Sequence, residues 1–371
     1  MLHSLLLAVA LGAPAGEGDL ARAIAAVRGV GPNGQGTAAA AQAWKRLAAA
    51  DVAELPALLA GMDGASPLAR NWLRSAIDPV LDRAARDKKP VPAAELEGFL
   101  RDTRHDPTAR RFAYELVVKA EPAAADRLLP GMLDDPSPDL RHDAVARVVD
   151  AADKLLKDDK KADAEAQFRR ALAAARDFEQ LDAIIKKLGE LGQKVTLAEH
   201  VGFLRSWKVV GPFPNPGGKG METVYPPEQG LDFAAEYDGK SGKVKWKEFT
   251  SKAADGVIDL NDAVGASPEG VAYAAAEFRS KDARAAEVRL GSFVGFKLWV
   301  NGELVLVRGD AYTGFDPDHY VAAVKLKPGA NTILVKFAQE PPPPQLPPPN
   351  HWRFMLRVCD PTGAAIAQAP R

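Results

Sequence analysis

The chain contains 371 residues, more than a single hydrophobic core usually supports, so at least two domains are expected. Hydrophobic residues make up 47% and charged residues 26%, which is ordinary for a soluble globular protein. The net charge of −1 lacks the strongly basic character of nucleic-acid-binding proteins. Neither nucleic acid nor an acidic membrane surface is therefore expected as a partner. Cys359 is the single cysteine, so no internal disulfide can form.

The N-terminus has the features of a secretory signal peptide over residues 1–15. A short apolar run, residues 5–11, precedes Ala13-Pro14-Ala15, a small-x-small pattern typical of a cleavage site. The run is too short to span a bilayer, which needs about 20 residues, and no later segment is apolar enough to do so. We expect an exported protein, periplasmic or extracellular, with no transmembrane segment. The alternative is the first turn of an ordinary helix.

Helical periodicity dominates residues 16–200, which we predict to be a helical repeat domain. Alanine-rich stretches carry apolar residues three and four positions apart, as from Leu140 to Ala152. Residues 58–70 match residues 128–141 with one insertion, and a third copy begins at Asp106. In each copy proline fits the first turn of a helix and a small polar residue caps it. One such hairpin cannot bury its apolar face alone, so the hairpins must stack.

The repeats place Asp or Ser-Pro before an arginine that is followed by small or apolar residues at +3 and +7. This pattern resembles HEAT repeats over about residues 40–155. The resemblance implies an α-solenoid used as a scaffold or binding surface, without catalysis. Residues 150–192 predict one more helical hairpin, which resembles a single tetratricopeptide unit. The charged run from Lys154 to Lys161 is most simply a solvated helix face and turn.

From Trp207 the helical period stops, and residues 201–371 are predicted to form an antiparallel β-sandwich. Asn301-Gly302 lies between two apolar strands and is the strongest short hairpin signal, because both turn residues need positive φ. The expected strands are 207–214, 271–278, 286–290, 296–300, 303–307, 321–326, 332–338 and 352–359. The fold class is therefore α+β multidomain, with an N-terminal α-solenoid and a C-terminal jelly roll.

Three features of the second half follow one another in a known order. They are the segment 297–302 (KLWVNG), then Tyr312, then the segment 326–336 (LKPGANTILVK). This order resembles the sugar-binding domain of family-two glycoside hydrolases, in the wider group of galactose-binding-like jelly rolls, over about residues 207–360. With Trp207 to Pro214 added, it also looks like a module of many uncharacterised secreted bacterial proteins. The resemblance implies no catalysis, since the carboxylates of those enzymes lie on a separate barrel that this sequence lacks.

The sequence contains no catalytic motif. The six histidines have no metal-ligand spacing, the serines no G-x-S-x-G elbow, and the glycines at 217–220 no P-loop order. Catalytic residues and cofactors are therefore not expected. Because jelly rolls of the resembled group often carry a structural calcium, the nearby carboxylates Asp310, Asp316 and Asp318 are metal candidates. The alternative is a polar loop rich in turn formers.

Aromatic side chains in loops form the expected ligand surface. Rings stack on the apolar faces of sugars, while neighbouring polar groups bond the hydroxyls. Trp299 and Tyr320 are expected to alternate into the core instead. The ligand-binding candidates, in or beside loops on one side of the predicted hairpins, are Tyr312, Phe315, His319 and Trp352.

These features predict a non-enzymatic exported binding or scaffold protein, with carbohydrate as the ligand of the jelly roll. The alternative is a protein–protein interaction adaptor that uses the solenoid surface, with a purely structural jelly roll. A third interpretation is an enzyme whose active site matches no motif. The expected partner is accordingly a carbohydrate or another protein.

Overall fold

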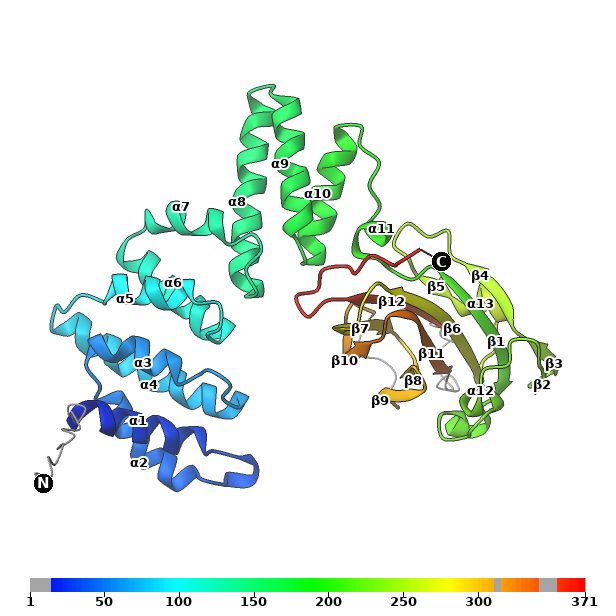
Figure 1. Ribbon diagram of the computed structural model, residues 1–371, viewed down its shortest axis with the longest axis horizontal. Coiled ribbons are helices and arrows are strands. Elements are labelled where there is room, and N and C mark those ends of the chain that lie inside the picture. The colour runs from blue at the N-terminus through cyan, green and yellow to red at the C-terminus, as the bar shows by residue number, and fades with distance from the viewer. Residues whose placement is uncertain (1–14, 310–314, 340–351, 371) are drawn as a thin grey trace, which may run out of the picture. The chain divides into compact units, whose positions relative to one another are not determined.

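The computed structural model describes residues 15–309, 315–339 and 352–370. Helices fill the N-terminal part of the chain and antiparallel sheets follow, which confirms the α+β architecture (Figure 1). The chain forms two compact units, one of residues up to 154 with 173–175, the other of residues 155–172 with 176–371. Helices thus contribute to both units. Of the expected signal peptide, only Ala15 falls within the described residues.

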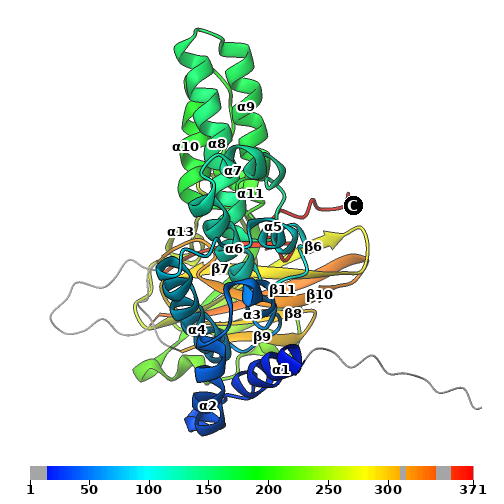
Figure 2. The ribbon, with the colours of Figure 1, turned by 90° about the vertical axis from the view of Figure 1, so that its left-hand side faces the viewer.

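The first unit is a series of packed helices joined by short turns (Figures 1 and 2). This arrangement is the expected helical repeat region. The helices are α1 (Ala15–Arg28), α2 (Thr37–Ala48), α3 (Leu55–Ala60), α4 (Pro67–Arg86), α5 (Ala93–Arg101), α6 (Pro107–Ala120), α7 (Ala124–Leu128) and α8 (Pro138–Lys157), the last of which ends in the second unit.

The repeated motif forms the start of α4, α6 and α8, each of which begins with proline. The side chains of Ser66 and Asp106 accept bonds from the first backbone N–H groups of α4 and α6, as expected for N-caps. The positions three and seven residues beyond the repeat arginine are all buried, so they form the helix face that packs inward. These residues are Leu73, Ile77, Ala113, Val117, Ala144 and Val148.

Two of the repeat arginines, Arg70 and Arg110, join one repeat to the next. Arg70 donates to Asp106 over 2.9 Å. Arg110 is 1% exposed and makes two bonds to Asp135, of 2.7 and 2.6 Å. Arg141 donates to the backbone carbonyl of Asp135 in its own repeat over 2.6 Å. The bidentate pair of Arg110 and Asp135 fixes both distance and orientation between two neighbouring repeats.

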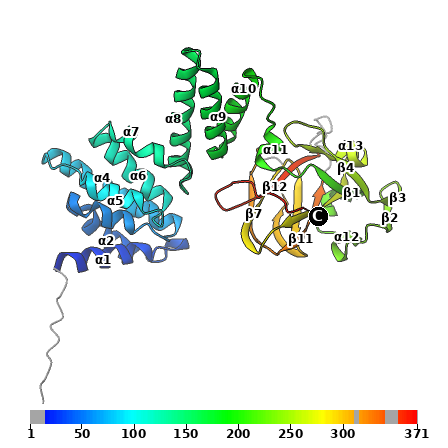
Figure 3. The same cartoon turned by 45° about the horizontal axis from the view of Figure 1, so that its top comes forward.

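The helical hairpin expected within residues 150–192 is formed by α9 (Lys161–Ala174) and α10 (Phe178–Glu190) (Figure 3). The short helix α11 (Leu197–Val201) follows it. Phe178 of α10 stacks on Phe203, with ring centroids 6.3 Å apart. The same ring lies 5.6 Å from the guanidinium carbon of Arg357, which belongs to a strand of the sandwich. The hairpin is therefore attached to the sandwich through an aromatic and cationic contact.

The sandwich consists of a six-stranded sheet, β4-β1-β6-β11-β8-β9, and a four-stranded sheet, β10-β7-β12-β5. A separate hairpin pairs β2 with β3. The strands are β1 (Ser206–Pro214), β2 (Glu236–Gly239), β3 (Gly242–Lys245), β4 (Lys247–Thr250), β5 (Ile258–Asp259), β6 (Gly270–Ser280), β7 (Arg284–Ser292), β8 (Gly295–Val300), β9 (Glu303–Arg308), β10 (Tyr320–Leu326), β11 (Gly329–Ala338) and β12 (Arg353–Cys359).

All eight expected strands are confirmed, and their inward residues fill one core between the two sheets. Asn301 and Gly302 have φ of 52° and 83°, the left-handed values that the β8–β9 turn requires. Asn331 is fully buried, and its amide donates to the carbonyls of Phe278, Lys327 and Gly329 while its carbonyl accepts from Asn301. This one side chain therefore fixes both neighbouring turns.

Residues 215–265 add elements to which the sequence assigned no individual position. They form η4 (Pro216–Met221), α12 (Pro226–Gln229), the β2–β3 hairpin, the edge strand β4, and α13 (Leu260–Val264). The strands here are short and alternate exposed with half-buried residues, so they carry a weak periodic signal. No helix within the described residues is long and apolar enough to cross a membrane.

Candidate functional site

The six-stranded sheet has a second face, turned away from the four-stranded sheet, which we call the outer face. Strand register places Lys208 of β1 beside Ala275 of β6, Ala275 beside Leu334 of β11, and Leu334 beside Trp299 of β8. Because neighbours in register point to the same side of a sheet, these residues form one row across four strands. A parallel row two residues further along consists of Val210, Tyr273, Lys336 and Lys297.

The part of the outer face around Tyr273 is covered by added segments. Phe213, Val271 and Tyr273 form a small apolar cluster there. Side chains from the stretch after β1 and from the β2–β3 hairpin, among them Tyr225 and Tyr237, pack on this cluster. The covering reaches Ala275 and Leu334 in the row that runs from Lys208 to Trp299, and both are buried, whereas Lys208 and Trp299 at its ends are only partly covered.

A buried polar cluster lies under the covering segments. The ammonium of Lys336 is 0% exposed and donates to Glu228 of α12 over 2.7 Å. It also donates to the carbonyls of Met221 and Thr223, over 3.2 and 2.6 Å. Glu228 accepts a further bond from the hydroxyl of Tyr273. Every proton of the ammonium is therefore bonded, and the lysine joins the sheet to η4 and α12.

Burial governs the titration of this cluster. It lowers the pKa of Lys336 against the opposing effect of Glu228. It raises the pKa of Tyr273, and the hydrogen bond to the Glu228 carboxylate raises it further. Glu228 thus accepts bonds from the ammonium of a buried lysine and from the hydroxyl of a buried tyrosine. Its place is fixed by these bonds, and it lines the wall of a neighbouring pocket.

The smaller pocket on the outer face has a volume of about 450 Å³ and contains the half-buried indole of Trp299. The β8–β9 turn contributes Asn301 to its lining, and β11 contributes Thr332. Lys327 and the loop after α12, through Leu231, complete the lining. The pocket thus combines one broad aromatic ring with amide, hydroxyl and ammonium groups.

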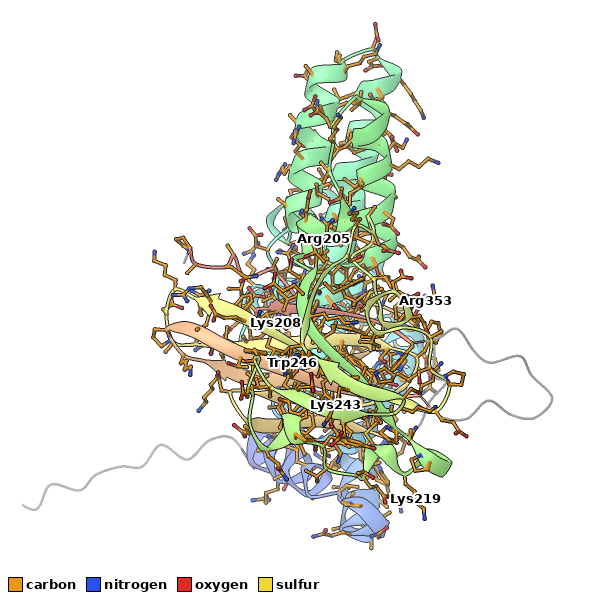
Figure 4. All side chains as sticks on the ribbon, turned by 90° about the vertical axis from the view of Figure 1, so that its right-hand side faces the viewer. Arg205, Lys208, Lys219, Lys243, Trp246 and Arg353 are labelled. Atoms are coloured by element: carbon orange, nitrogen blue, oxygen red, sulfur yellow. The ribbon has the colours of Figure 1, made fainter. Side chains whose placement is uncertain are left out.

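The larger pocket has a volume of about 850 Å³ and lies over β4, β1 and β6. Lys208, Glu277 and the exposed ring of Phe233 line it. The rings of Phe233 and Trp246 meet edge to face, with their centroids 5.2 Å apart. The ammonium of Lys208 lies 5.3 Å from the centroid of the Phe233 ring. Figure 4 shows Lys208 near Trp246, with Arg205 further along the same side of the sandwich. The two pockets share Thr332, so they are neighbours on one face.

Charges around the pockets are largely balanced by ion pairs. Lys208 pairs with Glu248 over 3.0 Å and Arg205 with Glu199 over 3.6 Å. Two further carboxylates that line the pockets also form ion pairs. Glu277 pairs with Arg279 over 3.1 Å, and Glu228 pairs with Lys336 over 2.7 Å. The face therefore offers hydrogen-bonding groups with little net charge.

Of the residues expected to bind a ligand, Trp352 is not at the surface. Trp352 is 0% exposed and belongs to the core between the sheets, so its indole cannot serve as a surface platform. Phe315 stacks on Phe293 at 4.6 Å, whereas the ring of His319 contacts Tyr320 at 4.6 Å. Tyr312 lies outside the described residues. Tyr320 packs against the core, as expected.

The carboxylates expected near a calcium ion are placed differently from one another. Asp318 is 14% exposed and binds Arg357 over 2.7 Å and Arg289 over 2.9 Å, so its oxygens serve two guanidinium groups. Asp316 is 80% exposed and lies 4.0 Å from His319. Asp310 lies outside the described residues. Within the described ranges, no group of three or more His, Cys, Asp or Glu side chains is arranged to hold a metal ion.

Trp299 is the site residue whose position the sequence reasoning misjudged. Leu298 and Val300 point into the core, so alternation along β8 turns the indole to the outer face. The same alternation places Lys297 on the outer face as well, so the pattern of this strand indicates that Trp299 points away from the core between the sheets. The nearby Asn301-Gly302 turn, which the sequence did identify, lines the same pocket.

Comparisons with known proteins add little to this geometry. No protein-family model matches the sequence, and no curated protein matches it either. Among solved structures, a β-glucosidase from Kluyveromyces marxianus is similar to 41% of the chain, with 11% sequence identity and a TM-score of 0.24. The chain spans 17% of the length of that enzyme. A likeness this weak carries no argument about fold or function.

Proposed function

We propose that the protein is a non-enzymatic binding protein whose β-sandwich, a galactose-binding-like jelly roll, binds carbohydrate on the outer face. The half-buried indole of Trp299 in the smaller pocket carries this proposal. A flat ring stacks on the apolar face of a sugar, and the amide, hydroxyl and ammonium groups around it can bond the sugar hydroxyls. The HEAT-like repeats and the tetratricopeptide-like hairpin act as a scaffold that carries this module.

Glycan binding by the full-length protein tests the proposal. Neutral and acidic polysaccharides are first screened on a glycan array, and the best ligand is then titrated by calorimetry. Trp299→Ala should weaken binding about tenfold or more, because a stacking contact worth roughly 1.4 kcal/mol is lost. Trp72→Ala, which removes an indole from the first unit, is the matched control and should bind normally. If no glycan binds at millimolar concentration, carbohydrate binding is wrong.

Export is part of this proposal, since the N-terminal segment has the pattern of a signal peptide. The protein recovered from the periplasm or medium should begin at Gly16, as shown by N-terminal sequencing. Recovery of the chain with an intact N-terminus from the cytoplasm alone would contradict export without affecting the glycan measurement.

A second candidate function, protein binding by the helical repeats, is favoured by an aromatic patch on the first unit. Trp44, Leu68 and Trp72 line a hollow of about 370 Å³ together with Asn71 and Ser75. The indole N–H of Trp44 donates to Ser75 over 2.9 Å, and Leu68 is 43% exposed. Tryptophan rings are typical of the central residues of protein interfaces. In this alternative the jelly roll is purely structural.

A further inference from the structure

The two pockets of the outer face lie along one path across the strands. Thr332 lines both pockets, and it pairs with Glu277, which lines the larger one. The loop after α12 contributes Leu231 to the smaller pocket and Phe233 to the larger one, two positions apart. A single strand therefore forms part of both floors and a single loop forms part of both walls. We call this path the outer-face groove.

The groove is longer than one sugar ring. Its floor runs from Lys208 on β1 through Glu277 of β6 and Thr332 of β11 to Trp299 on β8. Three strand spacings of about 4.8 Å each give a floor of roughly 14 Å. The partner of β1 on its other side, β4, extends the floor further through Glu248. A ligand that fills the groove is therefore a chain of several sugar residues.

Apolar rings are present at two separate places along the groove. Trp299 lies at the β8 end, in the smaller pocket. Phe233, 43% exposed, lies in the larger pocket within reach of Lys208 on β1. The hydroxyls of Ser206 and Thr250, bonded to each other over 3.0 Å, lie in the larger pocket as well. Two rings can each stack on a sugar of the same chain.

The charge pattern indicates the chemical class of that chain. Of the charged side chains that line the two pockets, Arg205, Lys208, Glu228, Glu248 and Glu277 each have a partner of opposite sign within 3.6 Å. An acidic polysaccharide needs unpaired cations to offset the cost of desolvating its carboxylates. Lys327 is a single cation, and one cation cannot offset a carboxylate on every repeating unit of such a chain.

We infer that the outer-face groove binds an uncharged glycan chain of several residues, which lies across β1, β6, β11 and β8 and stacks on both Trp299 and Phe233. This inference rests on the proposed carbohydrate binding and extends it to the length and charge of the ligand. Lys327 contributes a hydrogen bond at the Trp299 end rather than an ionic contact.

Calorimetric titration of the full-length protein with defined oligosaccharides tests the inference. The probes are cello-, xylo- and laminari-oligosaccharides from monosaccharide to hexasaccharide, with oligogalacturonate as the acidic comparison. Affinity should rise with chain length, and Phe233→Ala and Trp299→Ala should each weaken hexasaccharide binding about tenfold. Added salt should change neither result, because no ion pair with the ligand is formed. Val321→Ala, an exposed apolar residue of β10, is the control.

The possible results separate this inference from the function on which it rests. If a monosaccharide binds as tightly as a hexasaccharide and only Trp299→Ala matters, carbohydrate binding stands but the chain-binding groove is wrong. Tight, salt-sensitive binding of oligogalacturonate would overturn the assignment of an uncharged ligand. If no probe and no arrayed glycan binds, both proposals fail. Thermal unfolding of each variant shows whether it is folded, and Phe233 is exposed enough for its removal to be tolerated.

Discussion

At the scale of single residues, Asp318 ties the loop before β10 to two strands. Its carboxylate accepts bonds from Arg289 of β7 over 2.9 Å and from Arg357 of β12 over 2.7 Å. Burial alone raises the pKa of Asp318, but the hydrogen bonds and charges of the two arginines outweigh burial and lower it below its ordinary value of 3.8. Asp318 therefore remains ionised in the folded protein at pH values where it would otherwise take up a proton.

We predict that Asp318→Asn lowers the stability of the second unit by about 3 kcal/mol, because Arg357 is left buried without its counter-charge. The folded-state pKa is depressed, so the stability that the carboxylate contributes is complete above about pH 3.8 and is lost as the pH falls below it. Thermal unfolding against pH should show a smaller acid loss in the variant. Asp316→Asn, at an exposed position, is the control, and identical acid slopes in the wild type and Asp318→Asn would contradict the prediction.

The sequence could not show what Asp318 binds. In the chain it stands close to Asp310 and Asp316, and the resemblance to calcium-carrying jelly rolls made these three carboxylates metal candidates. Its actual partners, Arg289 and Arg357, lie 29 and 39 positions away. They reach it only because β7 and β12 are neighbours in the four-stranded sheet. Local spacing identifies a polar cluster, whereas long-range pairing decides its role.

At the scale of elements, local sequence patterns predicted where the strands and turns lie, whereas contacts between distant segments determine which side chains of the outer face are covered. The Asn301-Gly302 turn needs positive φ at both residues, which few residue types adopt, so it was predictable. The burial of Lys336 depends on α12 and the stretch before it. Those segments carry neither helical nor strand periodicity of useful length. The groove was therefore not predictable from strand patterns.

Lys336→Met should release α12 from the sheet. It leaves Glu228 buried without its cation and frees the carbonyls of Met221 and Thr223, so we expect a loss of about 3–5 kcal/mol in unfolding free energy. The double change Lys336→Met with Glu228→Leu removes both charges and should recover part of this loss. Chemical denaturation measures both effects. A double variant no more stable than the single one would show that the ion pair is not the reason for the loss.

At the scale of the whole molecule, two surfaces of different character lie on different units. The first unit has the aromatic patch of Trp44, Leu68 and Trp72, and the second has the outer-face groove. The repeat pattern made the helical stack predictable, since Arg70 and Arg110 recur where each repeat bonds the next. The patch was not predictable, because the exposure of Leu68 depends on which helix its own helix packs against. The two proposed functions therefore depend on surfaces that can be altered separately.

The patch leads to a prediction that separates the two units. A protein partner recovered from a cell-envelope extract with the full-length chain should be lost with Leu68→Asp and retained with Trp299→Ala. A charge at position 68 repels an apolar partner, and the 43% exposure of Leu68 lets the folded chain accept the change. Glycan titration of the same variants should show the reverse pattern, with Leu68→Asp binding normally. A partner that is lost with Trp299→Ala, or bound equally by all variants, would show that the aromatic patch is not its docking surface.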